Sequence, residues 1–247
     1  MTVLVGALCK DGVVIGSDSS ATFGPHQNFS TIEQPTDKTF VIEADVLLAG
    51  TGSVGLGQRF SAVVSGIRKQ PDWDSRTEIE KGKLFSAGGL SEFSQTFLKP
   101  GQYGSLVAYE ARGKLHLCEF AIQDFQPEWK TAKLWFASMG SGQTIVDPFL
   151  GLMRRVFFPS DQPTLAEGIF LVTWALEHAI DVNPGGINAP IQLGVLTIEN
   201  GQPIARLLES SELEDHRANV QSAEAHLANY TKQFRASPNL MSPSPPS

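Results

Sequence analysis

Short apolar runs separated by turn residues open the chain and predict a β-hairpin at its start. One run, rich in β-branched residues, covers positions 2–8, and a second covers 13–18, with Asp11-Gly12 between them. An Asp-Gly pair between two apolar runs is a strong hairpin signal. The first strand is therefore expected to begin at Thr2, which leaves almost no leader at a place where chains are usually frayed.

The same patterns continue along the chain and predict strands and helices in alternating groups. Further strands, mostly joined by tight turns, are expected at 39–42, 46–50, 104–110, 114–121, 132–138, 191–198 and 203–208. Helical spacing, or a charged helical pattern, predicts helices at about 53–68, 88–98, 143–157, 164–180 and 210–233. Two polar stretches, 19–37 and 70–82, are interpreted as connections with little regular structure.

The order of these elements indicates the fold class. Strands, two helices, strands, two helices and strands follow one another, and hairpin turns connect most of the strands. We predict an α+β fold, a four-layer αββα sandwich of two antiparallel sheets flanked by helix pairs. One domain is expected over residues 1–235, and the Pro- and Ser-rich residues 236–247 are expected to form a flexible tail.

Composition and charge exclude several classes of protein. Of 247 residues, 41% are hydrophobic and 18% are charged, which is typical of a globular chain with a large core. The net charge of −7 argues against nucleic acid or an anionic membrane as a partner. No run reaches the roughly 18 apolar residues of a membrane span, and no signal-peptide pattern opens the chain. We therefore expect a cytoplasmic protein.

Cysteine and histidine offer no pattern of metal ligation. The chain has two cysteines, Cys9 and Cys118, and each lies in an apolar run. Buried free thiols are therefore expected, and not a disulfide framework. The five histidines are scattered without metal-ligand spacing. The sequence indicates no metal and no cofactor.

A glycine-rich motif, G-x-G-x-x-G over residues 50–55, resembles a dinucleotide-binding fingerprint. That fingerprint needs a second, parallel strand after the helix. The residues that follow the helix, 69–76, are too polar for a buried strand, and the preceding strand is expected in a hairpin. We reject nucleotide binding here. The motif still presents bare N–H groups at a helix start, which suit a transient oxyanion.

Thr2 is a candidate nucleophile because of its place in the chain. A threonine hydroxyl needs a base, and one solution is the residue's own α-amine. A free α-amine has a pKa of about 7.7–8.0, which is close to working pH. Initiator methionine is usually removed before a small residue, so Met1-Thr2 could expose that amine. Many proteins begin in this way, so the hypothesis depends on the rest of the chain.

Several short segments, taken together and in order, carry a resemblance to a known family. They are residues 2–6, 10–15, 17–22 with Gly24, Lys38, 49–55, 140–143, and Asp181 followed by Gly185-Gly186. In order and spacing over about residues 2–208, the sequence resembles a proteasome β subunit and the peptidase subunit of the simpler bacterial ATP-dependent relatives. The resemblance implies an amino-terminal nucleophile hydrolase.

The resemblance assigns catalytic roles to six residues. It implies that Thr2 supplies both hydroxyl and amine, and that Asp18 pairs with Lys38 beside it. The backbone N–H of Gly52 would face the oxyanion. Two further residues would surround the α-amine, namely Ser141 and Asp181. The plain alternatives are a surface ion pair for Asp18 and Lys38, and ordinary turn residues for Gly52 and Ser141.

The resemblance also implies the substrate contacts. Ala21 and Thr22 would form a strand-like edge for an extended peptide, and Gly50 and Val54 would belong to the first specificity pocket. The family often has a bulky residue where this chain has Gly50, so the pocket is either open or filled from elsewhere.

Other departures from the family concern the catalytic region. Pro184 replaces a serine that is usual in the family, and proline donates no hydrogen bond. Ser20 replaces an arginine. The connection between Asp18 and Lys38 is a few residues longer than the family leads us to expect. These differences indicate a divergent bacterial-type homologue.

The main functional hypothesis is a threonine peptidase acting on peptides or unfolded polypeptide. The resemblance implies self-association into stacked rings with the active sites facing an inner chamber, and it leaves an ATP-dependent unfoldase partner open. Two alternatives remain. One is an amidase or transpeptidase with the same nucleophile, and the other is a catalytically silent ring subunit in which Met1 is retained.

Overall fold

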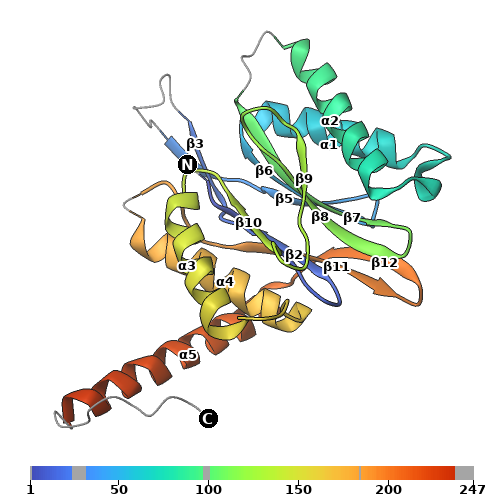
Figure 1. Cartoon of the computed structure of the whole chain (residues 1–247). Coiled ribbons are helices and arrows are strands. Elements are labelled where there is room, and N and C mark those ends of the chain that lie inside the picture. Colours follow the sequence, from blue (N-terminus) through green and yellow to red (C-terminus); the bar gives the residue numbers. More distant parts are fainter. Residues whose placement is uncertain (1, 24–31, 97–100, 184, 237–247) are drawn as a thin grey trace.

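Two five-stranded antiparallel sheets face each other in the computed structural model, which describes residues 2–23, 32–96, 101–183 and 185–236 (Figure 1). The first sheet has the order β10 (Phe136–Met139), β1 (Leu4–Leu8), β2 (Val13–Ser17), β11 (Gln192–Glu199) and β12 (Gln202–Leu207). The second has the order β5 (Thr39–Ile42), β6 (Val46–Gly52), β7 (Tyr103–Ala111), β8 (Lys114–Phe120) and β9 (Pro127–Trp129). A separate ribbon pairs β3 (Ser20–Phe23) with β4 (Ile32–Pro35).

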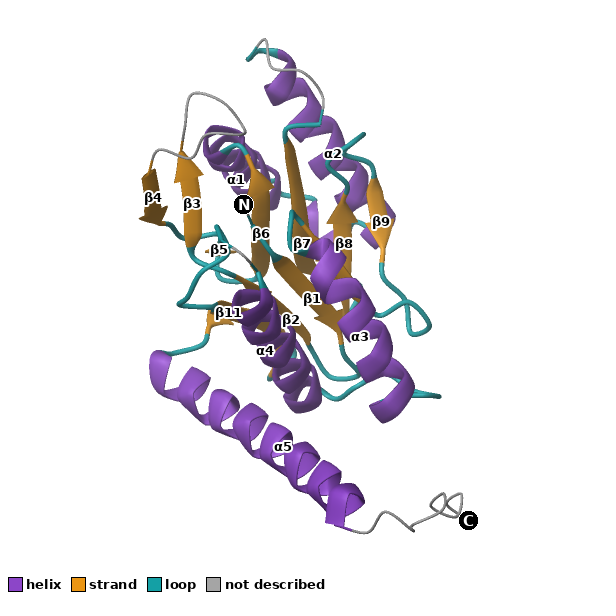
Figure 2. Ribbon diagram, turned by 90° about the vertical axis from the view of Figure 1, so that its left-hand side faces the viewer, coloured by secondary structure: helices purple, strands orange, loops and turns teal. Residues whose placement is uncertain are grey.

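Helices cover the outer faces of both sheets (Figures 1 and 2). The second sheet carries α1 (Val54–Arg68) and α2 (Glu78–Ser94), which a short 3-10 helix at Trp73–Ser75 connects. The first sheet carries α3 (Gln143–Phe157) and α4 (Leu165–Val182), and α5 (Ser210–Ala236) packs its first half on α4 and extends away from the body. The predicted four-layer αββα architecture with antiparallel sheets is confirmed.

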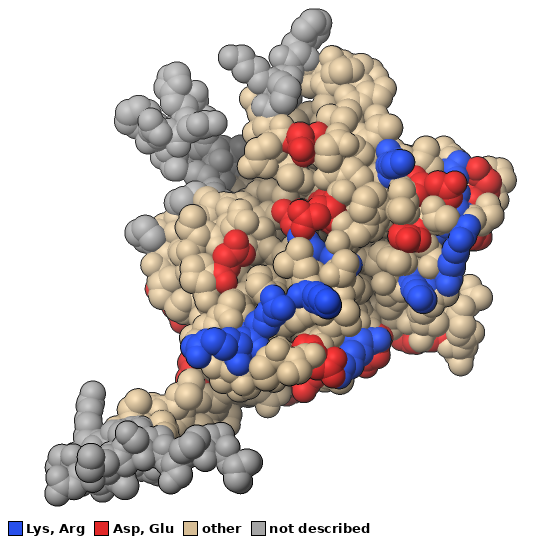
Figure 3. Space-filling model, in the orientation of Figure 1, with Lys and Arg blue, Asp and Glu red and all other residues tan. Residues whose placement is uncertain are grey.

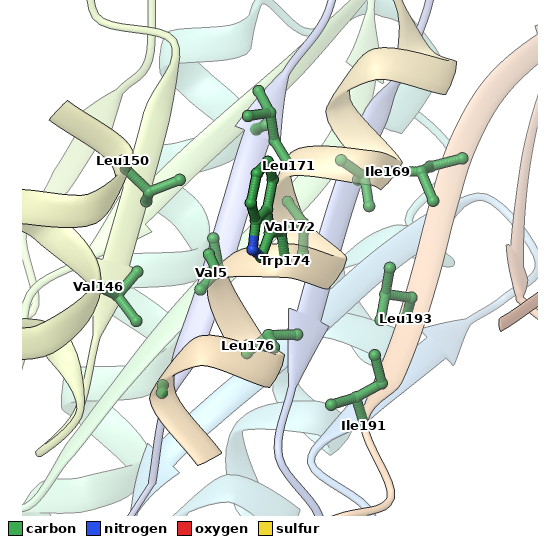
Figure 4. Close-up of a cluster of buried hydrophobic side chains, with 14 of the residues drawn as sticks. Val5, Val146, Leu150, Ile169, Leu171, Val172, Trp174, Leu176, Ile191 and Leu193 are labelled. Atoms are coloured by element: carbon green, nitrogen blue, oxygen red, sulfur yellow. The ribbon is translucent and has the colours of Figure 1, made fainter. Parts of the chain in front are cut away.

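Large apolar side chains pack between the first sheet and α4. Val5 of β1 and Leu176 of α4 are fully buried, and Trp174 has only 4% of its surface exposed (Figure 4). Burying side chains of this size contributes about 1.5–3 kcal/mol each. This packing holds β1 in place and so helps to position Thr2, which lies two residues before the first residue of that strand.

The prediction of a polar connection over 70–82 and a helix at 88–98 is wrong in its boundaries, because α2 begins at Glu78. Thr77 and Glu80 form a capping box at its start. Lys81 is fully buried, and its ammonium donates to the Glu110 carbonyl at 2.7 Å and lies over the Trp73 ring. The sequence alone does not distinguish a buried lysine with such partners from an exposed lysine.

The interpretation of 19–37 as a loop is also wrong in part, because β3 and β4 pair in an antiparallel ribbon. The polar composition of this stretch hides strands whose faces do not alternate clearly between apolar and polar residues. Near the middle of the chain, β10 begins at Phe136, later than the predicted 132, because residues 131–134 form a turn closed by backbone hydrogen bonds between Thr131 and Leu134.

The glycine-rich segment 50–55 lies between two antiparallel pairings. β6 pairs with β5 on one side and with β7 on the other, both antiparallel. The predicted hairpin of β5 and β6 is therefore confirmed, and the parallel neighbour that a dinucleotide-binding unit requires does not occupy either edge of β6.

Other expectations concern the surface and the termini. Cys9 and Cys118 are buried free thiols, as predicted. Within the described residues, no helix has the length and apolarity needed to cross a membrane. On the face shown in Figure 3, basic and acidic side chains are intermixed. The division into a domain over 1–235 and a tail over 236–247 stays a prediction, and residues 237–247 lie outside the described residues.

Candidate active site

Asp18 and Lys38 form a buried ion pair. Asp18 follows the last residue of β2 and is fully buried, and Lys38 immediately precedes β5 and is 7% exposed. Lys38 Nζ lies 2.7 Å from Asp18 Oδ1. The carboxylate also accepts hydrogen bonds from the backbone N–H groups of Val3 at 3.0 Å and Ser20 at 3.2 Å. Because buried charges need such compensation, this pair differs from the plain surface ion pair considered as the alternative.

Lys38 also reaches Thr2. Its ammonium donates to Thr2 Oγ1 at 3.2 Å, so one nitrogen bridges the carboxylate of Asp18 and the hydroxyl of Thr2. Three residues that are far apart in the sequence thus meet at the start of β1. A cation beside a hydroxyl stabilises the negative charge that develops on oxygen when the proton leaves.

The turn between β10 and α3 encloses Thr2 from the other side. Ser141 Oγ accepts a hydrogen bond from the Thr2 nitrogen at 3.0 Å, and its hydroxyl donates to the Thr2 carbonyl at 3.3 Å. The Gly142 N–H donates to the same carbonyl at 3.1 Å. With Met1 ahead of it in the sequence, this nitrogen is an amide, and it marks the place that a free α-amine would take. Ser141 therefore contacts the backbone of Thr2 on both sides of its Cα atom.

Gly140 must be glycine at this turn. Its φ of +89° lies in the left-handed region. A Cβ atom at Gly140 would lie 2.3 Å from the Thr2 carbonyl oxygen, well inside contact distance. The close approach of this backbone to Thr2 is what allows Ser141 and Gly142 to bind it.

A cavity of about 840 Å³ opens beside Thr2 and Lys38. Its walls come from β3, β5, β6, the first turns of α1 and one residue of β7. They include Ala21, Thr36, Phe40, Gly50, Gly52, Val54 and Tyr103. Three predicted substrate contacts, Ala21, Gly50 and Val54, therefore line one cavity with the predicted nucleophile. Thr22 belongs to β3, whose ribbon has only two strands among the described residues, but its side chain lies outside what the structure describes.

Gly52 lies in this cavity wall with a backbone that only glycine tolerates. Its φ is +103°, and a Cβ atom would lie 2.1 Å from the Gln102 carbonyl oxygen. The residue ends β6, and Ser53 caps α1 immediately after it. The glycine turn at a helix start that the sequence indicated is thus present beside Thr2.

Tyr103 fills the space next to Gly50. A Cβ atom at Gly50 would lie 2.5 Å from the Tyr103 hydroxyl oxygen, so the tyrosine of β7 occupies the place that a side chain at position 50 would take. Tyr103 therefore forms the cavity wall beside Gly50, in the place that a side chain at position 50 would take. No partner within hydrogen-bonding geometry reaches this hydroxyl among the described residues. Ser105 lies near it but donates to the Ala49 carbonyl, and burial raises the pKa of Tyr103.

One residue implied by the resemblance, Asp181, is not joined to this group among the described residues. Asp181 lies exposed in the last turn of α4, and its side chain forms no hydrogen bond with another described residue. Pro184 lies outside the described residues. The roles of Thr2, Asp18, Lys38, Gly52, Ser141 and Asp181 remain predictions. Thr2, Lys38 and Gly52 line one cavity, and Asp18 and Ser141 are hydrogen-bonded to Lys38 and Thr2. No group of three or more potential metal ligands gathers within the described ranges.

The chain is similar in sequence to proteasome subunits and in structure to ancestral β-subunits. The family model for proteasome subunits matches residues 2–191. The structure resembles an ancestral β-subunit (Anbu) from Yersinia bercovieri, with a TM-score of 0.73 and 12% identity over 94% of this chain and 97% of that one. It also resembles Anbu in a helical assembly from Pseudomonas aeruginosa, with a TM-score of 0.71 and 15% identity over 99% and 98%.

A third similar structure is a Gly-1 mutant of Anbu from Hyphomicrobium sp. strain MC1, with a TM-score of 0.68 and 13% identity over the full length of both chains. No curated protein matches the chain in sequence. At these identities the structural likeness concerns the fold.

Proposed function

The chain belongs to the proteasome subunit family, and we propose that it is a threonine-type endopeptidase in which Thr2 attacks the peptide bond. The observation that supports this most strongly is the Lys38 ammonium, which lies 3.2 Å from Thr2 Oγ1 and 2.7 Å from Asp18 Oδ1. A threonine that served only the fold would not need a buried cation at its hydroxyl.

The proposed reaction begins when removal of Met1 exposes the α-amine of Thr2. The amine takes the hydroxyl proton, and Oγ1 attacks the carbonyl carbon of the substrate. Lys38 favours the neutral amine by charge repulsion and stabilises the developing alkoxide by attraction. Asp18 holds the ammonium of the lysine in place. In this proposal Ser141, which already binds the Thr2 nitrogen, helps to move the proton.

The tetrahedral oxyanion is expected at the Gly52 turn, where a backbone N–H faces the cavity in the family. Collapse of this intermediate transfers the amine's proton to the leaving nitrogen and leaves an ester on Thr2. Water then attacks the ester, with the amine again as base, and releases the second product as a carboxylic acid. The balance needs water only, and no cofactor or metal enters a step.

The substrate proposed for this cleft is an extended peptide. Among the described strands β3 pairs only with β4, and we propose its other edge as the place where the peptide adds a strand. Ala21 lies on β3 and lines the cavity beside Thr2. A peptide along this edge would pass the nucleophile and place one side chain between Gly50 and Val54.

We further propose that the chain assembles with copies of itself in the cytoplasm. The Anbu complex of Pseudomonas aeruginosa forms a helical assembly, and this chain has an apolar strip on α3. Its members are roughly half exposed, namely Leu152, Val156 and Phe157. An apolar strip on an outer helix suits contact with a second copy. Substitution Phe157→Glu should lower the assembled mass in light scattering, whereas Leu134→Glu, equally exposed in a turn, should not.

Two measurements test the peptidase directly. Intact mass of the purified protein should show the loss of one methionine, since a blocked nitrogen cannot act as the base. Thr2→Ala should abolish cleavage of unfolded protein and of a peptide library, while Thr2→Ser keeps part of it. Retention of Met1 would favour the silent structural subunit, and undiminished cleavage by Thr2→Ala would refute Thr2 as the nucleophile.

A further inference from the structure

Gln192 begins β11 between two residues that face the helix layer. Ile191 and Leu193 are 2% and 1% exposed and belong to the cluster beneath α4 (Figure 4). Side chains alternate across a strand, so Gln192 points to the opposite side, toward the second sheet. It faces the start of β5, where Lys38 and Thr39 lie.

One amide side chain contacts four consecutive residues there. Gln192 Oε1 accepts from the backbone N–H of Lys38 at 2.9 Å and of Thr39 at 3.3 Å. Its Nε2 donates to the Thr36 carbonyl at 3.2 Å and to Asp37 Oδ1 at 2.8 Å. Both ends of the amide are therefore in use, and both bind the segment that carries the lysine.

The other side of that segment is fixed by neighbouring strands. The Lys38 carbonyl accepts from the Gly50 N–H of β6 at 3.1 Å. Ser17 of β2 bonds the Thr39 hydroxyl at 2.9 Å, and Ser17 is the register partner of Gln192. The backbone N–H of Lys38 is thus hydrogen-bonded to Gln192, and its carbonyl is hydrogen-bonded to β6.

The backbone of Lys38 needs these hydrogen bonds because a long connection precedes it. A long connection, including the β3–β4 ribbon, separates Asp18 from Lys38. The ammonium must also lie within hydrogen-bonding distance of both Thr2 and Asp18, at the end of a long and flexible side chain. A shift of the backbone by a fraction of an ångström is passed to the ammonium, and small misplacements of catalytic groups cost large factors in rate.

We propose that Gln192 is a positioning residue that sets the place of Lys38 relative to the Thr2 hydroxyl. This inference rests on the proposed function in one respect, since a rate effect requires Thr2 to be the nucleophile. Gln192 itself does not line the cavity beside Thr2. It acts through the backbone of residues 36–39, and it contacts neither the nucleophile nor the substrate.

The first variant to test is Gln192→Met, which keeps the length of the side chain and removes all four hydrogen bonds. We expect kcat for peptide cleavage to fall about ten- to hundredfold, with a much smaller change in KM. Gln162→Met is the matched control, because Gln162 binds the Leu8 carbonyl far from the cavity. It should leave kcat unchanged.

A polarity exchange provides the rescue. Gln192→Glu keeps the acceptor for Lys38 and Thr39 but turns an anionic oxygen toward Asp37 Oδ1, so kcat should fall. Adding Asp37→Asn places a donor amide opposite that oxygen and keeps one negative charge at the pair. The double variant Gln192→Glu/Asp37→Asn should recover at least about tenfold over Gln192→Glu alone, which corresponds to one good hydrogen bond. A double variant no better than the single one would contradict the proposal.

A readout without catalysis separates this inference from the peptidase proposal. In full-length protein with Thr2→Ala, amide hydrogen exchange of Lys38 and Thr39 should accelerate at least tenfold in Gln192→Met and slow again in the exchanged pair. The inference is wrong if amide exchange of Lys38 and Thr39 is unchanged in Gln192→Met. It is also wrong if the wild type cleaves peptide and Gln192→Met has the same kcat. If wild type cleaves no peptide but exchange follows the prediction, the peptidase proposal fails and the placement of Lys38 by Gln192 stands.

Discussion

The Lys38 ammonium lies 2.7 Å from the Asp18 carboxylate, and their side chains are only 8% and 0% exposed. A pair so far from solvent is costly to break, because the attraction between the two charges compensates for the hydration that each has lost. The pair therefore couples the stability of the fold to the proposed chemistry at Thr2. The two contributions can be separated by removing one charge or both.

Lys38→Met should destabilise the protein by about 3–5 kcal/mol, since it leaves the Asp18 charge buried without a counter-ion. Peptide cleavage should fall at least about a hundredfold, as expected when the group that stabilises developing charge is lost. Asp18→Asn/Lys38→Met should regain part of the stability and none of the activity. Urea unfolding and peptide assays on both variants check this. Equal stability of the two variants would show that the charge is not the cause.

Gly140→Ala should weaken both the fold and the site. The added Cβ would lie 2.3 Å from the Thr2 carbonyl oxygen at a φ of +89°, and such strain costs on the order of 1–3 kcal/mol before the displacement of Thr2 is counted. Gly151→Ala is the matched control. It lies in α3, where no atom comes within 4 Å of the added Cβ, so it should stabilise by about 0.5–1 kcal/mol. Thermal unfolding distinguishes them, and equal shifts would contradict the close contact.

Tyr103→Phe should leave the free energy of unfolding unchanged or raise it by up to about 1 kcal/mol, since it removes a buried hydroxyl that has no partner among the described residues. Tyr109→Phe is the contrasting variant. Its hydroxyl donates to the Glu78 carbonyl at 2.9 Å and accepts from Trp129 Nε1 at 2.8 Å. Its loss should cost about 1–3 kcal/mol. If both variants are destabilised alike, the Tyr103 hydroxyl has a partner that the geometry does not reveal.

The sequence predicts the layers because hairpin turns and helical spacing are local signals. Asp11-Gly12 and the apolar runs beside it are enough to place β1 and β2. Local signals fail where a polar residue is buried or a strand lacks alternation. Lys81 therefore hides the first turns of α2, and the polar residues of 19–37 hide β3 and β4.

Some residues of the candidate site could be predicted from the sequence, and others could not. Thr2, Asp18 and Lys38 could be named in advance because each lies beside a recognisable strand, and the family resemblance ordered them. Tyr103 and Gln192 could not be named, since their roles depend on how strands pair. Gln192 lies 154 positions from Lys38, and no spacing rule joins them. Asp181 shows the opposite case, because the resemblance names it but its side chain forms no hydrogen bond with another described residue.

His116 should make stability fall at mildly acid pH. It lies on β8 opposite Tyr109, and burial is the main cause that lowers its pKa below the ordinary value near 6.5, with Glu78 and Glu110 opposing the shift. The folded state therefore binds this proton less readily than the unfolded state. The stabilising contribution is complete above the ordinary pKa and is lost as pH falls from there through the lower folded pKa.

The test compares melting temperatures of wild type and His116→Gln at steps between about pH 7.5 and pH 5, a range that spans the ordinary histidine pKa. The wild-type melting temperature should fall over this range, and the variant should show a shallower fall because it has no imidazole at that position to protonate on unfolding. Burial also lowers the pKa of His216, so His216→Gln is the matched control and should flatten the curve by its own share. If His116→Gln follows the wild-type curve in parallel, the half-buried imidazole of His116 is not the origin of the pH dependence.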